Sequence, residues 1–374
     1  MTTLITNAQV HTGEILKKNH AILIKNGTIQ AVLPKIPEGF EGKTVDLRGQ
    51  HIAAGFIDLH INGGEKWYFT QSVTAETLAD IADSSRALGT THTMPCLITS
   101  PLENILRGVK VMRDFMKKHL QSGVLGMHLE GPFLNPIRRG AHLKEYLQMP
   151  TDTALDTLIN EGKDVIKIMT IAPELFTDAQ IDKLIASGIH IAVGHSDATY
   201  AQATHAFNKG VTLCTHLFNA MSQMQHRAAG VVGAVLDTPE VYAPIILDGI
   251  HCSYEAARIA YKIKKDKLVL ISDALFVGHK KQRFEWGDFN ATLKNGEYRN
   301  AEGNLAGAAI AMADAVHNAV FKVGISLEEA VKMATVRPAK AIKMDNKIGR
   351  IRKGHLANFV MFDEKLERFK TLQY

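Results

Sequence analysis

Residues 189–195 read Ile-His-Ile-Ala-Val-Gly-His, and residues 211–216 read Val-Thr-Leu-Cys-Thr-His. Each stretch is a short, mostly apolar run of the length of a strand, and each ends in a histidine. Six further runs of this kind lie between residues 53 and 273, and amphipathic stretches separate them. Alternating buried strands and amphipathic helices predict βα units around a parallel sheet, and eight such units close a TIM (β/α)8 barrel.

The segments between the runs carry helix signals. Ser100-Pro101-Leu102-Glu103 has the pattern of a capping box with proline at the first helical position, which predicts a helix to about residue 120. Further helices are predicted over 74–88, after Thr177, and as one long helix over 326–341. The eight apolar runs are 53–60, 90–96, 123–130, 165–173, 189–195, 211–216, 242–249 and 267–273.

Both ends of the chain differ from this middle part. Two apolar stretches flank Asn26-Gly27, a strong signal for a tight β-hairpin, and a second hairpin is expected around Asn295-Gly296. The tail after residue 349 returns to strand-like alternation, so we expect it to pair with the N-terminal strands. The sequence predicts a mixed α/β protein with a small β-sandwich domain formed by residues 1–52 and 349–374, and a barrel domain over 53–348.

Composition excludes several classes of protein. The 374 residues are 46% hydrophobic and 22% charged, and the formal net charge of +5 is spread along the chain. We therefore expect no nucleic-acid or membrane partner, although a mildly basic chain suits a small anionic substrate. No stretch reaches the length of a membrane span, and the N-terminus lacks the pattern of a secretion signal. Three cysteines are too few for a disulfide scaffold, so we expect a cytoplasmic protein.

The residues that end the runs carry the chemistry. His60, Glu130, His195, His216 and Asp273 each end a predicted strand, and TIM-barrel enzymes place their active sites at that rim. A single histidine at a strand end is more often structural, but five such groups on one rim indicate a metal site. Two imidazoles and a carboxylate with one open position are typical of hydrolytic zinc, so we assign Glu130, His195 and His216 as ligands. The metal would make hydroxide available at neutral pH, and Asp273 would carry the proton to a leaving nitrogen.

Seven short motifs identify a resemblance across essentially the whole chain. They resemble, in order and spacing, the N-acetylglucosamine-6-phosphate deacetylases of the amidohydrolase superfamily. The C-terminal stretch GRIRKGHLANFVMFD also resembles the strands with which amidohydrolases return to their small β domain. The motifs are GFIDLHING, HLEGPFLN, GHSDAT, THLFNAM, DGIHC, SDA and NLAG.

The resemblance implies roles for individual residues. Glu130, His195 and His216 match the metal ligands, and Asp273 matches the catalytic acid/base. His142 matches a histidine that helps to polarise the acetyl carbonyl. The resemblance also implies a phosphorylated N-acetyl amino sugar as substrate and a homodimer. The substrate-contacting positions are Ala141, Asn219, Ala220, Arg227, His251, Leu305, Ala306 and Gly307.

Physical chemistry supports the anion-binding roles. Asn219 and Ala220 are expected where a strand gives way to a helix, and backbone N–H groups at a helix start bind anions. Arg227 can hold a phosphate with two parallel hydrogen bonds. A surface position for Arg227 and a packing role for His251 are the competing interpretations.

Two departures from the family pattern bear on the metal and on the substrate. Many superfamily members carry His-x-His after the first strand, whereas this chain has His60-Ile61-Asn62, and asparagine is a poor zinc ligand. We therefore expect one divalent ion, zinc first, with iron, manganese or cobalt left open, and His60 as an accessory or second-metal residue. No lysine ends the fourth run, so a carbamylated lysine ligand is not expected.

The second departure lies at residues 227–230, Arg-Ala-Ala-Gly, where the family usually has Glu-Pro between the arginine and the glycine. Losing the proline loosens the loop that places Arg227, which leaves N-acetylgalactosamine 6-phosphate open as the substrate. The resemblance leaves it open whether Arg227 or His226 reaches a neighbouring subunit. A non-catalytic scaffold is the remote alternative, and Cys96, Cys214 and Cys252 are read as packing residues.

Overall fold

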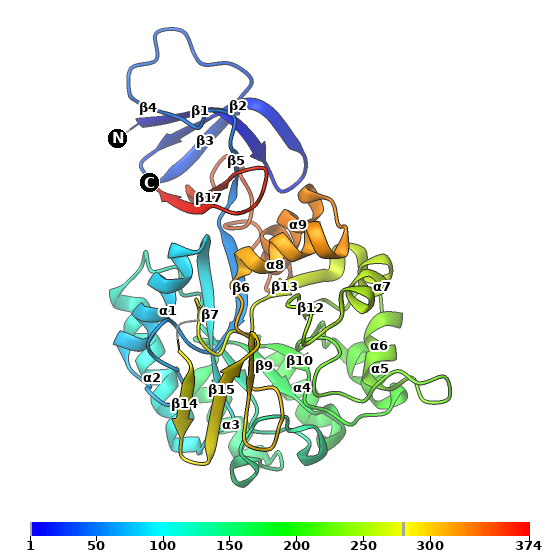
Figure 1. Cartoon of the computed structure of the whole chain (residues 1–374). Helices are drawn as coiled ribbons and strands as arrows, with labels where there is room; N and C mark the ends of the chain where they lie inside the picture. The colour runs from blue at the N-terminus through cyan, green and yellow to red at the C-terminus, as the bar shows by residue number, and fades with distance from the viewer. Residues whose placement is uncertain (1, 279–280) are drawn as a thin grey trace.

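The computed structural model describes residues 2–278 and 281–374. Strands from both ends of the chain form one seven-stranded sheet, at the top of Figure 1. Val360 in the C-terminal part pairs with Ala53 in the N-terminal part, so the predicted pairing of the two ends is confirmed. The strands of this terminal sheet are β1 (Thr2–His11), β2 (Leu16–Lys25), β3 (Thr28–Leu33), β4 (Lys43–Asp46), β5 (His51–Ala54), β17 (Asn358–Phe362) and β18 (Phe369–Gln373).

The terminal sheet has a core of its own, although Ala53 in β5 and Val360 in β17 pack in the core of the rest of the molecule. Ile22 and Ile24 in β2 alternate with outward-facing residues and pack with Ile52 in β5 and Phe359 in β17. Asn26 and Gly27 turn the chain between β2 and β3 with φ of 50° and 75°, as the Asn-Gly pair predicts. The sandwich form and the boundaries of this domain stay predictions.

The middle of the chain holds eight parallel strands, one in each predicted apolar run. β6 to β11 form a six-stranded sheet in chain order, and β12 pairs with β13. Single parallel bridges, Leu213 with Tyr242 and Ile61 with Ala274, join the two groups at either edge. The strands are β6 (Phe56–Ile61), β7 (Thr90–Ile98), β8 (Met127–Glu130), β9 (Ile166–Ile171), β10 (His190–Val193), β11 (Leu213–Cys214), β12 (Ala243–Ile246) and β13 (Leu268–Ile271).

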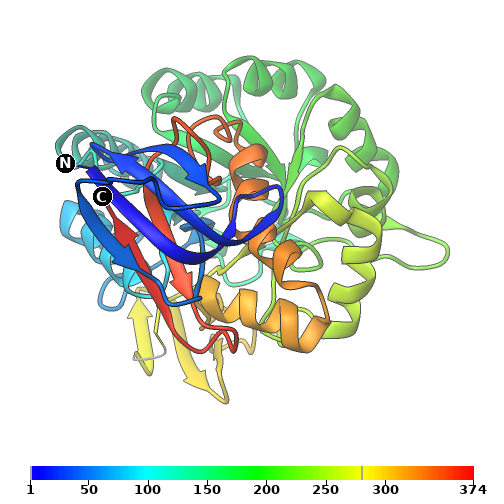
Figure 2. The same cartoon turned by 90° about the horizontal axis from the view of Figure 1, so that it is seen from above.

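Helices lie on the outside of the curved array of strands, as the view from the terminal sheet shows (Figure 2). Short 3-10 helices at Pro136–Arg138, Lys144–Tyr146, Pro173–Leu175 and Lys265–Lys267 and a π-helical turn at Ala319–Val323 complete the helical elements described. The α-helices are α1 (Ala75–Ala87), α2 (Leu102–Lys118), α3 (Asp152–Gly162), α4 (Asp178–Ala186), α5 (Tyr200–Lys209), α6 (Gly230–Asp237), α7 (Tyr254–Lys264), α8 (Met312–Asn318), α9 (Leu327–Ala334) and α10 (Val336–Ala341).

Two predictions about helices are wrong in detail. α2 begins at Leu102, and Ser100 does not cap it, because Ser100 is buried and accepts a hydrogen bond from the Asn104 side chain instead. The long helix expected over 326–341 is two helices, α9 and α10, which meet at Thr335. Pro338 has no N–H, and its ring crowds the carbonyl four residues earlier, which breaks the helix at this point.

A three-stranded antiparallel insertion follows β13. It consists of β14 (Arg283–Trp286), β15 (Phe289–Lys294) and β16 (Glu297–Arg299), and Asn295-Gly296 makes the predicted hairpin turn between the last two. Phe289 stacks on Tyr68, which lies between β6 and α1, and this contact holds the insertion over the ends of the strands. Among the described residues, none of the helices combines the length and hydrophobicity needed to cross a lipid bilayer.

Candidate metal and substrate site

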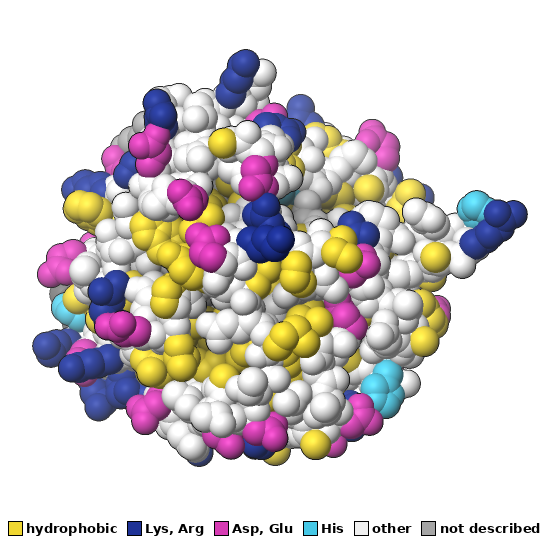
Figure 3. All heavy atoms as spheres, turned by 90° about the horizontal axis from the view of Figure 1, so that it is seen from below, with side chains coloured by type: hydrophobic (Ala, Val, Ile, Leu, Met, Phe, Trp, Pro, Cys, Tyr) yellow, Lys and Arg dark blue, Asp and Glu magenta, His cyan; other side chains and the backbone are white. Residues whose placement is uncertain are grey.

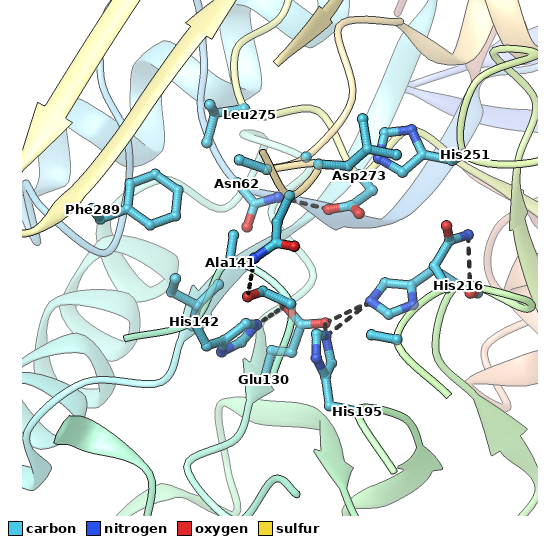
Figure 4. A pocket seen from close by; sticks show the side chains of 18 of the residues that line it. Asn62, Glu130, Ala141, His142, His195, His216, His251, Asp273, Leu275 and Phe289 are labelled. Atoms are coloured by element: carbon cyan, nitrogen blue, oxygen red, sulfur yellow. Dashed lines mark hydrogen bonds and ion pairs between the residues drawn. The ribbon is translucent and has the colours of Figure 1, made fainter. Parts of the chain in front are cut away.

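A cavity of about 360 Å³ opens at the carboxyl ends of the parallel strands (Figure 4). Its volume is in the range of a small-molecule site, and its walls combine apolar side chains with a few converging polar groups. The predicted residues that line it are Glu130, Ala141, His142, His195, His216, Asn219, Ala220, His251, Asp273, Leu305, Ala306 and Gly307.

Glu130, His195 and His216 meet at one point on the floor of this cavity. The Oε1 atom of Glu130 lies 3.1 Å from Nε2 of His195 and 3.1 Å from Nε2 of His216, and the two Nε2 atoms are 3.1 Å apart. All three side chains are buried. Two imidazole nitrogens facing one carboxylate oxygen fit a divalent cation, because zinc in catalytic sites takes three protein ligands of this kind and leaves one position open.

The backbone turns sharply where the strands deliver these groups. His195 and His216 follow β10 and β11 with φ of 49° and 27°, and Asp273 follows β13 with φ of 47°. Non-glycine residues rarely adopt this left-handed conformation, and strained backbone of this kind clusters at functional sites. The turns direct the three side chains into the cavity (Figure 4).

Hydrogen bonding and burial prepare His195 to act as a ligand. Its Nδ1 atom lies 2.9 Å from the carbonyl oxygen of Arg138, which can only accept, so Nδ1 carries the hydrogen and Nε2 presents its lone pair. Burial, followed by the nearby His142, lowers the pKa of His195 to about 4. The ring is therefore neutral at pH 7, as metal binding requires.

Glu130 uses its two oxygens differently. Oε1 faces His195 and His216, while Oε2 lies 3.4 Å from Nε2 of His142 and 3.4 Å from Nε2 of His60. Burial acts to raise the pKa of Glu130, but the attraction of His60 and the hydrogen bonds from His142 and His195 outweigh it and hold that pKa well below its usual value. The residue is an anionic carboxylate across the physiological range.

Asp273 lies on the other side of the cavity floor, held by the first strand. Asn62 donates its side-chain N–H to Oδ1 of Asp273 at 2.8 Å, and Nε2 of His60 lies 3.3 Å from the same oxygen. The peptide N–H of Asp273 donates to the carbonyl oxygen of His60 at 2.9 Å. Asn62 therefore positions the aspartate, a role that the sequence reading of Asn62 as a poor zinc ligand missed.

Asn219 does not stand at the start of a helix, so this expectation is wrong. The chain leaves β11 into a turn, and α6 begins only at Gly230. The peptide N–H of Asn219 already donates to the carbonyl oxygen of His216. Asn219 and Ala220 still line the cavity, but the anion-binding argument from a helix terminus does not apply to them.

Two predicted residues lie away from the cavity wall. Arg227 is not among the described residues that line it, and lies in an exposed segment, 223–228, closed by a bridge between Gln225 and Ala228. This segment projects from the body in Figures 1 and 2, and in the view from below the projecting tip carries basic and histidine side chains (Figure 3). His60 approaches Glu130 and Asp273 from beneath the cavity floor and lines a second, much smaller cavity.

Sequence reasoning missed several partners of the site. Oδ2 of Asp248 lies 2.6 Å from Nδ1 of His251, and both side chains are buried, so a carboxylate orients this histidine. The three-residue spacing in DGIHC is the only sequence signal for this pair. Thr99, which directly follows β7, contacts Nδ1 of His142 at 2.8 Å, and Cys96 in β7 lies 3.7 Å from Oε2 of Glu130.

Comparison with known proteins gives a consistent result. Residues 51–373 match the sequence profile of the amidohydrolase family. N-acetylglucosamine-6-phosphate deacetylase from Haemophilus influenzae is 39% identical over 372 residues, covering 98% of this chain and 97% of that protein. N-acetylgalactosamine-6-phosphate deacetylase from Shewanella sp. strain ANA-3 is 34% identical over 362 residues, with coverage of 96% and 91%. The crystal structure of N-acetylglucosamine-6-phosphate deacetylase from Pasteurella multocida superposes with a TM-score of 0.94 at 35% identity, covering 100% of this chain and 98% of that one.

Proposed function

The chain belongs to the amidohydrolase family, and we infer that it hydrolyses the acetamide of N-acetylglucosamine 6-phosphate to glucosamine 6-phosphate and acetate. The observation that carries this inference is the meeting of Glu130, His195 and His216 at the floor of a sugar-sized cavity, with Asp273 across from them. The similarity to relatives that carry this activity extends over nearly the whole chain.

The family is metal-dependent, and the donor set of this chain fits one divalent ion. We propose zinc, with iron, manganese and cobalt as alternatives, because one carboxylate and two imidazoles suit all four. When bound, such an ion polarises a carbonyl and lowers the pKa of water to about 7. The residues that hold it are Glu130, His195 and His216.

Asp273 is the proposed general base and acid. Its carboxylate takes a proton from the attacking water as the new carbon–oxygen bond forms, and returns that proton to nitrogen as the carbon–nitrogen bond breaks. Asn62 fixes Oδ1 of Asp273, which leaves Oδ2 to carry the proton. The products are acetate and the free amine, so the proton balance closes without a further group.

His142 is the proposed donor to the acetyl carbonyl. The Thr99 hydroxyl donates to the carbonyl oxygen of Glu130 at 3.2 Å, and its oxygen lies 2.8 Å from Nδ1 of His142, which fixes the ring. Nε2 of His142 lies 3.4 Å from Oε2 of Glu130, which can only accept, so Nε2 carries a hydrogen at the cavity wall. An N–H in this position stabilises the oxyanion that develops during attack.

The remaining cavity residues are proposed to hold the sugar phosphate. His251, oriented by Asp248, contacts the substrate, together with Ala141, Asn219 and Ala220. Leu305, Ala306 and Gly307 close the cavity from the loop after β16. We propose that the protein is a homodimer and that the exposed Arg227 or His226 serves the cavity of the neighbouring subunit, since neither residue lines its own cavity.

N-acetylgalactosamine 6-phosphate is the second candidate substrate. The relative from Shewanella supports it, as does the altered loop at residues 227–230. A non-catalytic scaffold is the weakest reading, because all four groups of the proposed machinery are present and converge.

One set of assays tests the function. Acetate release from the two phosphorylated sugars and from their unphosphorylated forms is measured before and after chelation, and in Asp273→Asn. We expect the highest kcat/KM for N-acetylglucosamine 6-phosphate, loss on chelation, and a loss of at least about a hundredfold in the variant. Full activity of Asp273→Asn would remove Asp273 from the mechanism, and preference for the galacto sugar would select the second candidate.

We further propose that the eight parallel strands close into a (β/α)8 barrel over residues 53–348, with residues 1–52 and 349–374 as a separate β-sandwich domain. The two single bridges between the six-stranded and two-stranded sheets support closure, and the terminal sheet's own core supports the division. All three cysteines are buried free thiols, which supports a reducing, cytoplasmic location.

A further inference from the structure

One carboxylate, that of Glu174, joins the loops that follow two strands of the proposed metal site. Glu174 lies in the 3-10 helix after β9, and β9 lies between β8 and β10 in the sheet. Its Oε2 atom accepts the hydroxyl hydrogen of Ser196 at 2.6 Å. Its Oε1 atom accepts the peptide N–H of Asp197 at 2.7 Å and a side-chain N–H of Asn135 at 3.0 Å. All three partners donate, which suits a carboxylate, and such charge-assisted bonds are about twice as strong as neutral ones.

The loop after β8 supplies the hydrogen-bond partner of His195. Asn135 caps the 3-10 helix Pro136–Arg138, because its Oδ1 atom accepts the peptide N–H of Ile137 at 2.9 Å. The carbonyl oxygen of Arg138, at the end of that helix, accepts the hydrogen on Nδ1 of His195 at 2.9 Å. The peptide N–H of Asn135 donates to the carbonyl oxygen of His195, again at 2.9 Å. This loop therefore holds both the backbone and the ring of His195.

The loop after β10 is held by the same carboxylate. His195 has a φ of 49°, a conformation that costs energy and persists only where the surrounding structure holds it. The two residues that follow it, Ser196 and Asp197, both donate to Glu174. Asp197 also accepts from Nε of Arg138 at 2.8 Å, but both side chains of this ion pair are 34% exposed, and such a pair is weak by itself. Glu174 is therefore the stronger connection between the turn at His195 and the carbonyl group that orients its ring.

We propose that Glu174 is a positioning residue that fixes the His195 ring and thereby raises the affinity of the site for its divalent cation. The serine and aspartate of GHSDAT and the asparagine of HLEGPFLN have no part in the proposed chemistry, and their hydrogen bonds to Glu174 account for them. Removing the partner of a ligating histidine typically lowers metal affinity about 10–100-fold. Glu174 acts through Arg138, one step further away, so we expect an effect near the lower end of this range.

A purely structural role for Glu174 predicts a different outcome, because it would lower the stability of the fold without changing cation affinity. Glu174→Ala leaves the three donors without their acceptor. Glu174→Gln keeps Oε1 for Asp197 and Asn135, and the oxygen of Ser196 can accept from the new NH₂ group. The glutamine variant should therefore restore most of the affinity that the alanine variant loses.

The test uses the full chain, stripped by chelation and titrated with Co²⁺ alone, with a competing coloured chelator to measure the Kd. We expect Glu174→Ala to raise the Kd for Co²⁺ about tenfold. Glu329→Ala is the matched control. Glu329 in α9 is also a partly buried carboxylate, paired with Lys332 and Arg337, and it is not among the described residues that line the cavity. This control should lower the thermal stability and leave the Kd unchanged.

Thermal unfolding of each variant shows whether a raised Kd reflects a loss of fold. If Glu174→Ala does not fold, Glu174→Asp takes its place, because its shorter side chain cannot reach both loops. An unchanged Kd in the variant that folds, or an equal rise in Glu329→Ala, would overturn the role of Glu174.

Acetate release separates this inference from the proposed function, on whose metal site it rests. Because Glu174 is not among the described residues that line the cavity, the variant should lose activity at limiting zinc and recover it at saturating zinc. Normal acetate release with an unchanged Kd removes only the role of Glu174. A raised Kd in a protein that releases no acetate from either sugar supports that role and removes only the proposed reaction.

Discussion

Asp58 in β6 is a buried carboxyl group whose titration should change the stability of the protein with pH. It lies beneath the cavity floor, where Oδ2 accepts the hydroxyl hydrogen of Ser272 and Oδ1 accepts the peptide N–H groups of His60 and Ser272. Burial raises the pKa of Asp58 from 3.8 to about 6, because these hydrogen bonds offset only part of the lost hydration. The folded protein therefore holds a proton on Asp58 over a pH range in which the unfolded chain has released it.

The sign and size of the effect follow from this difference. A raised pKa of an acid favours folding below the unfolded value, and that contribution is lost as the pH rises through the folded value. One pKa unit corresponds to about 1.4 kcal/mol. From a pH well below 3.8 to a pH well above 6, the free energy of unfolding of the unaltered protein therefore falls by about 3 kcal/mol relative to that of a variant that cannot titrate. Most of this loss, about 2 kcal/mol or more, falls between pH 4 and pH 8.

Asp58→Asn is the matched variant. Its carbonyl oxygen keeps the two peptide N–H bonds, and its NH₂ group can donate to Ser272, whose hydroxyl turns to the carbonyl oxygen of His60, now 3.4 Å away. We expect the unfolding free energy of the variant minus that of the unaltered protein to rise by about 2–3 kcal/mol from pH 4 to pH 8. Urea unfolding of both proteins at several pH values, with and without chelator, measures it. A difference that stays constant across this range would refute the assignment of a raised pKa to Asp58.

Three further predictions concern the site. Chelation should reduce acetate release by at least about a hundredfold, and added zinc should restore it, since the ion supplies the polarising charge; unchanged activity at a measured metal content of zero contradicts this. Asp248→Asn should raise KM about tenfold with kcat nearly unchanged, because a charge-assisted hydrogen bond to His251 is worth about 1.5–3 kcal/mol. Steady-state kinetics that show a fall in kcat alone would contradict a substrate-binding role for His251. Asn62→Ala should lower kcat about 10–100-fold by freeing Asp273, with metal content unchanged; a lost equivalent of metal would instead make Asn62 a ligand.

The parallel strands and the site residues that follow them could be predicted from the sequence, because the local pattern of each run also determines its place in the fold. Each parallel strand is a short apolar run bounded by a polar group, and the carboxyl ends of such strands meet at one rim whatever the detailed packing. Glu130, His195 and His216 therefore come together as predicted. Asn26-Gly27 also turns as predicted, because positive φ at both positions is a local property of those residues.

The failures arise where another hydrogen bond or a backbone constraint overrides the local pattern. Ser100 fits a capping pattern but is buried beside Asn104, and the side chain bonds there. Cys96 packs in a hydrophobic core as predicted, but nothing near it in the sequence shows that β7 and β8 place it beside Glu130. The periodicity of apolar residues continues through Pro338, so it predicts one helix. Proline nevertheless disrupts the backbone there, which separates α9 from α10 at Thr335.

The pairing of β5 with both β1 and β17 also bears on synthesis of the chain at the ribosome. β5 leads into β6 after one residue, yet the edge of β5 that pairs with β17 stays open until residues 358–362 leave the exit tunnel. An open edge is a template for wrong pairing with other chains. The nascent protein thus exposes an unpaired strand edge through most of translation. Chaperone protection should matter most until β17 has been synthesised and pairs with β5.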